Sequence, residues 1–461
     1  MDDNGLQGRR VLVMGLGLHG GGVETARYLV RSGARVTCTD LRSEADLAPS
    51  LEALGDLDVR YVLGEHRQRD FDAADLIVKN PAVPSDSPWI AGRTNVETDI
   101  SLFLRSCESP LIAVTGSKGK STVVTALHHL MRRWAPGVRL GGNITVSPLS
   151  FLDRLDAGDP VILELSSWQL ADLRGRGLLH PRVCSITNLM HDHQNRYASF
   201  ADYEADKRII FEHDTPGGLA VFPDDDFGTR WAASFPGESI LVSAEGPPTL
   251  ADPRIPRAWI DREGRGLYRG GSGDEELVPE RLGVPGAPFR LNALFAAVIA
   301  RRSGGDAATI RDALGDFAGV PYRMELFLED GGLRFYDDTA ATIPDAAAAG
   351  VRAMDRPVIL IAGGTDKDLD FAPFRSAARI PKRIVMLPGS ATDLWMPLLR
   401  RDGASVEGPA KDMDDAVRRA LAAAEPGDAV LLSPGAASFG LFRHEFQRGD
   451  AFKEACRAQI R

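Results

Sequence analysis

The segment PLIAVTGSKGKSTVVTALHHLMRRW, residues 110–134, decides the fold of this chain. It begins with a short apolar run, passes through two glycines and two lysines, and ends in a stretch with the apolar spacing of a helix. A strand, a glycine-bearing loop and a helix in this order are typical of a phosphate-binding loop. The spacing is one variant away from GxxxxGK[ST], so a glycine turn with surface lysines is the alternative interpretation.

This loop predicts a nucleotide site. In such loops the backbone N–H groups surround the phosphate oxygens, a lysine meets the terminal phosphates and a hydroxyl reaches Mg²⁺. Lys120 and Ser121 occupy the last two positions. Lysine is scarce in this chain, since eight of its 54 basic residues are lysine, and two of these eight lie here. The expected nucleotide-binding residues of the loop are Gly116, Ser117, Lys118, Gly119, Lys120, Ser121 and Thr122.

The composition favours a cytoplasmic globular protein. At roughly 150 residues per domain, 461 residues suggest about three domains. The net charge of −10 argues against a nucleic-acid-binding protein. The polar first residues do not read as a signal peptide, and no apolar run approaches the ~18 residues of a membrane span. The four cysteines are widely spaced, which fits reduced thiols better than disulfides or a zinc site.

Short apolar runs alternate with longer amphipathic segments along the chain, which is the pattern of an α/β protein. Residues 10–14 and 34–39 are expected strands on either side of a helix, and residues 356–361 and 429–432 are expected strands near the C-terminus. We therefore expect a Rossmann-like N-terminal domain over residues 1–108, a central P-loop-type ATPase domain over residues 109–319 and a Rossmann-like C-terminal domain over residues 320–461.

A second glycine pattern, Gly15-x-Gly17-x-x-Gly20, follows the first expected strand, and Asp40 lies twenty residues later. Glycines permit the tight turn, and the N-terminus of the next helix offers N–H groups to a diphosphate. The pattern predicts a site for a nucleotide diphosphate. An ordinary strand-to-helix turn is the alternative, and the pattern alone does not identify NAD.

Two further motifs follow buried strands. Glu164 begins ELSSWQL, where a carboxylate at the end of a strand is suited to bind Mg²⁺ or to cap the next helix. His193 lies in NLMHDHQNRY, a cluster that can ligate a metal. Lys207, fourteen residues later, is either a surface lysine or, after reaction with CO₂, an anionic carbamate that can bind Mg²⁺.

At these residues the chain resembles the Mur ligase family of peptidoglycan synthesis. TGSKGKST, ELSSWQL, NLMHDHQNRY and Lys207 are similar to the central ATPase domain of that family, and ELSSWQL resembles the branch that adds D-glutamate. The resemblance extends over essentially the whole chain. It implies an ATP- and Mg²⁺-dependent ligase that joins glutamate to UDP-N-acetylmuramoyl-L-alanine through an acyl phosphate. These partners are small molecules, so we expect neither nucleic acid nor a membrane as partner, and we expect a monomer.

The resemblance also implies roles for individual residues in the first two domains. The catalytic residues would be Lys120, Glu164, His193, Lys207 and, from the third domain, Arg323. Mg²⁺ would be held by Ser121, Glu164, His193 and carbamylated Lys207. The UDP-sugar would contact Gly15, Gly17, Leu18, Asp40, Arg42, Asn143, Ser166 and Gln169.

In the third domain the resemblance continues in five short segments: PYRME, DDTAAT, GGTDK, LSPGAASF and the pair Arg448-Gly449. Arg323, in PYRME, would bind the γ-phosphate of ATP, and Asp338, in DDTAAT, would hold the ribose. Asn292, in the expected central domain, would help to hold adenine. The incoming glutamate would contact Thr342, Lys367 in GGTDK, and Ser438 and Phe439 in LSPGAASF.

Three departures from the family pattern touch the ATP and glutamate sites. Pro288 and Phe289 stand where the family has His-Asn, so Phe289 is a candidate to stack on adenine. Ala340 replaces a lysine, and Glu445 stands where an aromatic residue is expected. These changes leave open ligation of L-glutamate, or a nucleotide-binding protein of this fold without ligase activity. A NAD-dependent oxidoreductase is a third possibility that rests on the first glycine pattern alone.

Overall fold

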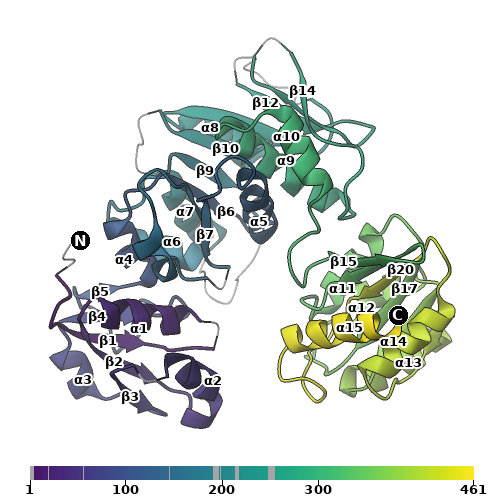
Figure 1. Cartoon of the computed structure of the whole chain (residues 1–461), viewed down its shortest axis with the longest axis horizontal. Coiled ribbons are helices and arrows are strands. Elements are labelled where there is room, and N and C mark those ends of the chain that lie inside the picture. Colours follow the sequence, from purple (N-terminus) through teal and green to yellow (C-terminus); the bar gives the residue numbers. More distant parts are fainter. Residues whose placement is uncertain are drawn as a thin grey trace. The chain divides into compact units, whose positions relative to one another are not determined.

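The computed structural model describes residues 5–18, 20–55, 57–144, 146–190, 197, 199–212, 217–247, 255–271 and 273–460. The chain forms two compact units. The first unit contains Met1–Arg262, Leu267–Leu277 and Leu294–Ile310. The second unit contains Glu263–Gly266, Val278–Ala293 and Arg311–Arg461. Figure 1 labels elements of both units.

The N-terminal part of the first unit is a five-stranded parallel sheet in the order β3-β2-β1-β4-β5. The order reverses between β1 and β4, and ligands of open α/β sheets bind at such a point. Four apolar residues of β1 are buried, and the helices pack on the sheet through their apolar stripes. The elements are β1 (Arg10–Met14), α1 (Gly21–Arg31), β2 (Arg35–Asp40), α2 (Glu44–Leu54), β3 (Val59–Leu63), α3 (Gln68–Ala73), β4 (Leu76–Lys79), β5 (Val96–Glu97) and α4 (Asp99–Ser106).

The central part is a nine-stranded sheet in the order β14-β13-β12-β11-β10-β9-β6-β8-β7. The seven neighbouring strands β12, β11, β10, β9, β6, β8 and β7 run parallel. Strand β6, which precedes the glycine-bearing loop with Lys118 and Lys120, lies between β9 and β8. The elements are β6 (Leu111–Thr115), α5 (Lys120–Met131), β7 (Arg139–Gly142), β8 (Val161–Glu164), α6 (Ser167–Leu173), β9 (Val183–Ile186), α7 (Phe200–Arg208), β10 (Leu219–Pro223), α8 (Asp226–Ser234), β11 (Glu238–Ser243), β12 (Arg257–Ile260), β13 (Gly266–Arg269), β14 (Glu275–Val278), α9 (Ala287–Arg302) and α10 (Ala307–Gly315).

The C-terminal part of the second unit is a six-stranded sheet in the order β15-β16-β20-β17-β18-β19, with β15 antiparallel at one edge. Both faces are covered: Phe374 and Trp395 belong to one buried apolar cluster, and Val417 and Phe452 to another. The elements are β15 (Glu325–Asp330), β16 (Leu333–Asp337), α11 (Pro344–Ala353), β17 (Val358–Gly363), α12 (Ala372–Ala377), β18 (Arg383–Leu387), α13 (Ser390–Arg401), β19 (Val406–Glu407), α14 (Met413–Ala423), β20 (Ala429–Leu432) and α15 (Glu445–Gln459).

These three sheets confirm the expected α/β class, with Rossmann-like sheets near both ends and a P-loop-type sheet between them. The boundaries at residues 108 and 319 stay predictions, because the contacts group the first two sheets into one unit. Within the part of the chain that the structure describes, no helix is long and apolar enough to cross a membrane.

Candidate functional site

The first unit contains a cavity of about 650 Å³, which we call the first-unit pocket. It lies where loops follow the carboxyl ends of β1, β2, β4, β6, β7 and β8. Parallel strands deliver their following loops to one edge, so residues far apart in sequence meet there. The pocket brings together these predicted residues: Gly15, Gly17, Leu18, Asp40, Arg42, Gly116, Lys120, Asn143, Ser166, Gln169 and Lys207.

The glycine loop after β1 forms one end of the pocket. Gly15 and Gly17 both have positive φ, and a Cβ on Gly15 would lie 2.9 Å from Cβ of Asn80. One Asp40 carboxylate oxygen accepts a hydrogen bond from Gly17 N (3.1 Å) and the other from Arg42 N (2.9 Å). Asp40 therefore holds the loops that line this end. Asn80 also lines the pocket, although no sequence pattern pointed to it.

The loop after β6 has the geometry expected of a phosphate site. Gly119 adopts the left-handed conformation and precedes α5 without a side-chain cap. The Nζ atom of Lys120 donates to Gly116 O (2.9 Å) and Ser117 O (3.1 Å). A Cβ on Gly116 would lie 2.0 Å from Oγ1 of Thr187, so only glycine fits there. The first helical turn of α5 can thus offer backbone N–H groups to an anion.

The segment after β9 fixes this loop in place. The side chain of Asn188 accepts from Lys118 N (2.9 Å) and donates to Lys118 O (3.0 Å). Ser117 Oγ accepts from Met190 N (2.9 Å) and lies 2.9 Å from the hydroxyl of Tyr203. The Ser117 hydroxyl thus forms hydrogen bonds within the protein. Asn188 begins a motif that the sequence did identify, but its bonds to the loop depend on β9 pairing with β6.

Glu164, at the end of β8, is buried, with 1% of its surface exposed. Its Oε1 accepts from the Asn143 side chain (2.9 Å), whereas no described residue forms a hydrogen bond with its buried Oε2. A buried polar atom without a partner is costly, so a ligand at this atom would offset a desolvation cost. The other predicted function for Glu164, capping the next helix, is performed by Ser166.

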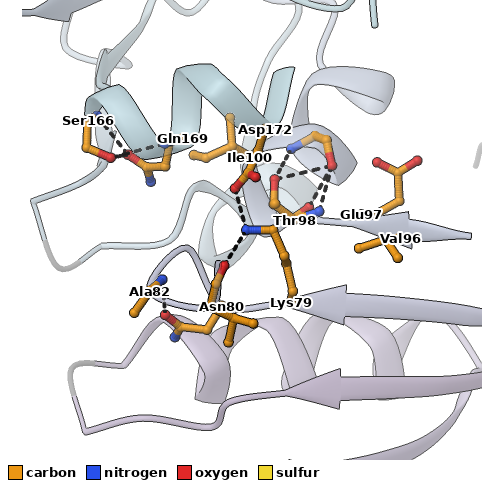
Figure 2. A network of polar contacts seen from close by, with 12 residues as sticks. Lys79, Asn80, Ala82, Val96, Glu97, Thr98, Ile100, Ser166, Gln169 and Asp172 are labelled. Atoms are coloured by element: carbon orange, nitrogen blue, oxygen red, sulfur yellow. Dashed lines mark hydrogen bonds and ion pairs between the residues drawn. The ribbon is translucent and has the colours of Figure 1, made fainter. Parts of the chain in front are cut away.

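Ser166 and Gln169 form a reciprocal cap at the start of α6, shown in Figure 2. Ser166 Oγ accepts from Gln169 N (3.2 Å), and Gln169 Oε1 accepts from Ser166 N (3.0 Å). This capping box explains why the sequence SSWQ starts a helix here. It also fixes the positions of two side chains that line the pocket.

Lys207, on α7, is 2% exposed, so the interpretation as a surface lysine is wrong. Its Nζ atom donates to Gly116 O (2.9 Å) and to Thr115 Oγ1 (3.3 Å), and it lies 4.8 Å from the centre of the Tyr203 ring. Ser121 is half-buried in the first turn of α5. His193 lies outside the described residues. Among the residues that are described, no three His, Cys, Asp or Glu side chains form a cluster able to hold a metal.

In the second unit, Arg323 is exposed between two residues with positive φ, Tyr322 (64°) and Met324 (47°). Non-glycine residues rarely adopt this conformation. Asp338 helps to hold it, since its Oδ1 accepts from Met324 N (3.2 Å) and its Oδ2 from Ser433 Oγ (2.7 Å). Burial raises the pKa of Asp338 to about 7.

The predicted glutamate-binding residues come together in this unit. Lys367 Nζ donates to Thr342 Oγ1 (3.0 Å), and the Thr365 hydroxyl donates to the Phe439 carbonyl. Thr342 lies in the loop after β16, Lys367 in the loop after β17 and Phe439 in the loop after β20. The three strands are neighbours in the sheet. Ser438 is buried and Phe439 is 62% exposed.

Arg448 contacts the same loops; the family resemblance includes the pair Arg448-Gly449 but implies no role for it. It is 1% exposed, and its guanidinium donates to Thr339 O (3.0 Å), Thr339 Oγ1 (3.0 Å) and Ala436 O (3.1 Å). Burial lowers the pKa of Arg448 to about 10.

The predicted adenine-binding residues lie on α9. Asn292 is half-buried there. Phe289 stacks on Phe317, with ring centres 5.8 Å apart and planes 7° from parallel. One face of Phe289 is therefore already used within the protein.

Comparison with known proteins assigns this architecture to a family. Residues 9–101 match the Mur ligase MurD-like N-terminal domain, residues 114–300 the Mur ligase middle domain, and residues 322–435 the Mur ligase glutamate ligase domain. UDP-N-acetylmuramoylalanine–D-glutamate ligases are similar over nearly their whole length. The protein from Treponema pallidum is 38% identical (98% of each chain), and that from a Roseiflexus species is 40% identical (97% of this chain and 98% of the relative).

Solved structures agree on the fold. UDP-N-acetylmuramate–alanine ligase MurC from Thermotoga maritima has a TM-score of 0.61 at 18% identity, covering 98% of this chain and 99% of that one. MurF ligase from the same organism, solved with ADP, has a TM-score of 0.56 at 15% identity, covering 100% and 99%. From the three matching domains and the full-length relatives, the chain belongs to the Mur ligase family.

Proposed function

We propose that this protein is an ATP-dependent ligase of peptidoglycan synthesis that joins D-glutamate to UDP-N-acetylmuramoyl-L-alanine. The observation that carries the proposal is the first-unit pocket, which is lined both by the glycine loop after β1 and by the phosphate loop after β6. One cavity thus joins a site suited to a nucleotide diphosphate with a site suited to ATP phosphates. The names of the full-length relatives support the amino acid and the acceptor.

The UDP-sugar occupies the first-unit pocket. Its uridine diphosphate lies against Gly15, Gly17 and Leu18, with Asp40 and Arg42 on the adjoining loop. Its muramoyl part extends towards the central sheet, where Asn143, Ser166 and Gln169 line the same cavity. The backbone N–H groups of the glycine loop suit the diphosphate because they are fixed donors beside a helix N-terminus.

ATP binds at the phosphate loop and uses Mg²⁺. The residues present fit a cation, because Glu164 Oε2 is buried without a hydrogen-bond partner among the described residues. Ser121 and Glu164 would hold one ion, and His193 with Lys207 as a carbamate would hold a second. When bound, Mg²⁺ neutralises charge on the phosphate oxygens. In the second unit, Asp338 contacts the ribose in addition to its own hydrogen bonds, since a carboxylate offers about four acceptor positions.

The reaction has two steps. The carboxylate of the UDP-sugar attacks the γ-phosphorus of ATP, so that ADP leaves and an acyl phosphate forms. The amine of glutamate then attacks the acyl carbon, phosphate leaves from the tetrahedral intermediate, and the amine loses a proton as the amide forms. Lys120 and Arg323 offset the negative charge on the transferred phosphoryl group. Thr342, Lys367, Ser438 and Phe439 orient the glutamate.

Phosphate release tests the proposal against a protein of this fold that binds nucleotides without ligating. We expect release from ATP to rise at least tenfold when UDP-N-acetylmuramoyl-L-alanine and D-glutamate are both present, because each substrate is needed for turnover. Release that is unaffected by the two substrates would exclude ligase activity. A NAD-dependent oxidoreductase is excluded by the family, and absence of nicotinamide binding checks that directly.

A further inference from the structure

Lys79, at the end of β4, is a buried lysine that none of the motifs explains. Its side chain is 3% exposed, and its Nζ atom lies 2.7 Å from Oδ2 of Asp172, whose side chain is 5% exposed. The same ammonium donates to Val83 O at 2.9 Å. Figure 2 shows Lys79 extending from its strand to the carboxylate of Asp172 on α6.

The two partners of Lys79 belong to two segments, from different sheets, that contribute residues to the first-unit pocket. Val83 ends a short loop after β4 that lines the cavity. That loop is tightly folded, since Asn80 Oδ1 accepts from Ala82 N (3.0 Å) and Asn80 O accepts from Val83 N (2.9 Å). Asp172 lies on the helix whose first turn carries the pocket residues Ser166 and Gln169. One ammonium group therefore ties a segment from the first sheet to a segment from the central sheet.

A fully buried ion pair is a poor device for stability alone. Removing two charges from water is expensive, and apolar residues of similar size are often as stabilising. The geometry does favour a lysine, because an ammonium has three donors in a compact head that can serve the carboxylate and the carbonyl together. Lysine is scarce in this chain, and one of its eight lysines occupies this buried position. What the pair adds over an apolar contact is a fixed position of the two segments.

A second contact crosses the same boundary without reaching the pocket. Arg176, just after α6, lies 2.6 Å from Glu97 and donates to Val96 O (2.9 Å). None of these three residues lines the first-unit pocket. Arg176 therefore provides a matched control: its loss weakens the boundary between the sheets but leaves the loop Asn80–Val83 and its tie to α6 in place.

We propose that Lys79 and Asp172 are positioning residues for the UDP-sugar, which hold the loop after β4 and helix α6 at the separation that the bound substrate requires. This inference rests on the proposed function, because it takes the UDP-sugar as the occupant of the pocket. Neither side chain lines the first-unit pocket, so neither contacts the substrate directly. Their loss weakens substrate binding and leaves the chemical step unchanged, which is the kinetic pattern of lost uniform binding.

The test uses the full-length double variant Lys79→Met/Asp172→Leu, which removes both charges together and so avoids a lone buried carboxylate. Circular dichroism melting verifies that it folds. Binding of UDP-N-acetylmuramoyl-L-alanine is measured by calorimetry, and KM and kcat by phosphate release. We expect the Kd and KM for the UDP-sugar to rise about tenfold, with kcat and the KM for ATP within about twofold. Arg176→Met is expected to change the Kd and KM by less than about twofold.

An unchanged Kd in the folded double variant overturns the inference, and so does an equal rise in Arg176→Met. If the double variant does not fold, Asp172→Ala serves instead, since it removes the tie to α6 while Lys79 keeps its hydrogen bond to Val83 O. An unchanged Kd in folded Asp172→Ala overturns the inference as well. Wild-type protein that binds the UDP-sugar but makes no product contradicts the proposed function alone. Wild-type protein that does not bind the UDP-sugar contradicts both.

Discussion

The two units build their candidate sites from different materials. In the first unit, glycine loops and helix N-termini do most of the work, and side chains such as Asp40 and Asn188 hold the backbone in shape. In the second unit, side chains from the loops after three neighbouring strands, such as Lys367 and Thr342, form the candidate site themselves. A phosphate is recognised by fixed backbone donors, whereas an amino acid is recognised by individual charged groups. The difference sets how each site responds to mutation.

The electrostatics of the two units also differ. In the first unit two ammonium groups, those of Lys120 and Lys207, converge on the carbonyl of Gly116. In the second unit buried carboxylates gather near β16, where burial raises the pKa of Asp337 to about 6 and that of Asp338 to about 7. At the phosphate loop, Lys120 therefore offers a positive charge to an anion, whereas the buried acids near β16 change their charge near neutral pH.

The largest effect is expected at the phosphate loop. Lys120→Ala removes the cation that follows the backbone donors of the phosphate loop, so kcat should fall about 10³-fold. Lys411→Ala, an exposed lysine of the second unit, is the control and should keep full activity. Steady-state phosphate release measures both. A loss below tenfold in Lys120→Ala would break the comparison, because the backbone alone would then suffice.

Variants of Lys207 sharpen the comparison, because they test whether the buried side chain of Lys207 acts as an anion. Lys207→Ala should lower kcat about 100-fold, the upper range for groups that support a metal. A short carboxylic acid such as acetate should restore part of the activity, because it supplies the missing anionic oxygens. Lys207→Arg retains a cation and should not respond to acetate. Wild-type activity of Lys207→Ala without any addition would refute the carbamate.

The second unit should show a side-chain effect confined to one substrate. Lys367→Ala removes a charge-assisted hydrogen bond of about 2 kcal/mol, so the KM for D-glutamate should rise about 30-fold. The KM values for ATP and the UDP-sugar should stay within about twofold, which initial-rate kinetics at saturating co-substrates can establish. Equal increases for all three substrates would show that Lys367 supports the fold and not the glutamate site.

The smallest effect concerns pH. Because the pKa of Asp338 is raised to about 7, the folded state holds a proton there that the unfolded state has lost, from about pH 4 to 7. Its contribution therefore favours folding below that range and declines as the pH rises through 7. Asp338→Asn has no such proton, so wild-type protein should lose about 2 kcal/mol relative to the variant between pH 5 and 7.5. Urea unfolding at both pH values measures the free energy of unfolding of the two proteins. The same difference between them at pH 5 and at pH 7.5 would contradict this prediction.

The parts of the candidate site that are formed by backbone loops were the easiest to predict from the sequence. The loops at Gly15 and Gly116 follow from glycine spacing, because only glycine adopts such turns so close to Asn80 and Thr187. Long-range contacts escaped it. The burial of Lys207 depends on Thr115 and Gly116, about ninety residues earlier, and no local pattern encodes that pairing.

Two further long-range contacts escaped the sequence for the same reason. The partner of Lys79 lies 93 residues away, on a helix attached to another sheet. Phe289 is half-buried against Phe317, whereas its position in the motif suggested only a ring available to adenine.

One measurement tests the central claim most directly: mass spectrometry of the products formed from ATP and UDP-N-acetylmuramoyl-L-alanine with either D- or L-glutamate. We predict a UDP-sugar extended by one glutamyl residue with D-glutamate, together with one ADP for each product formed, and at least tenfold less with L-glutamate. No extended product with D-glutamate, or preferential extension with L-glutamate, would contradict the proposed function.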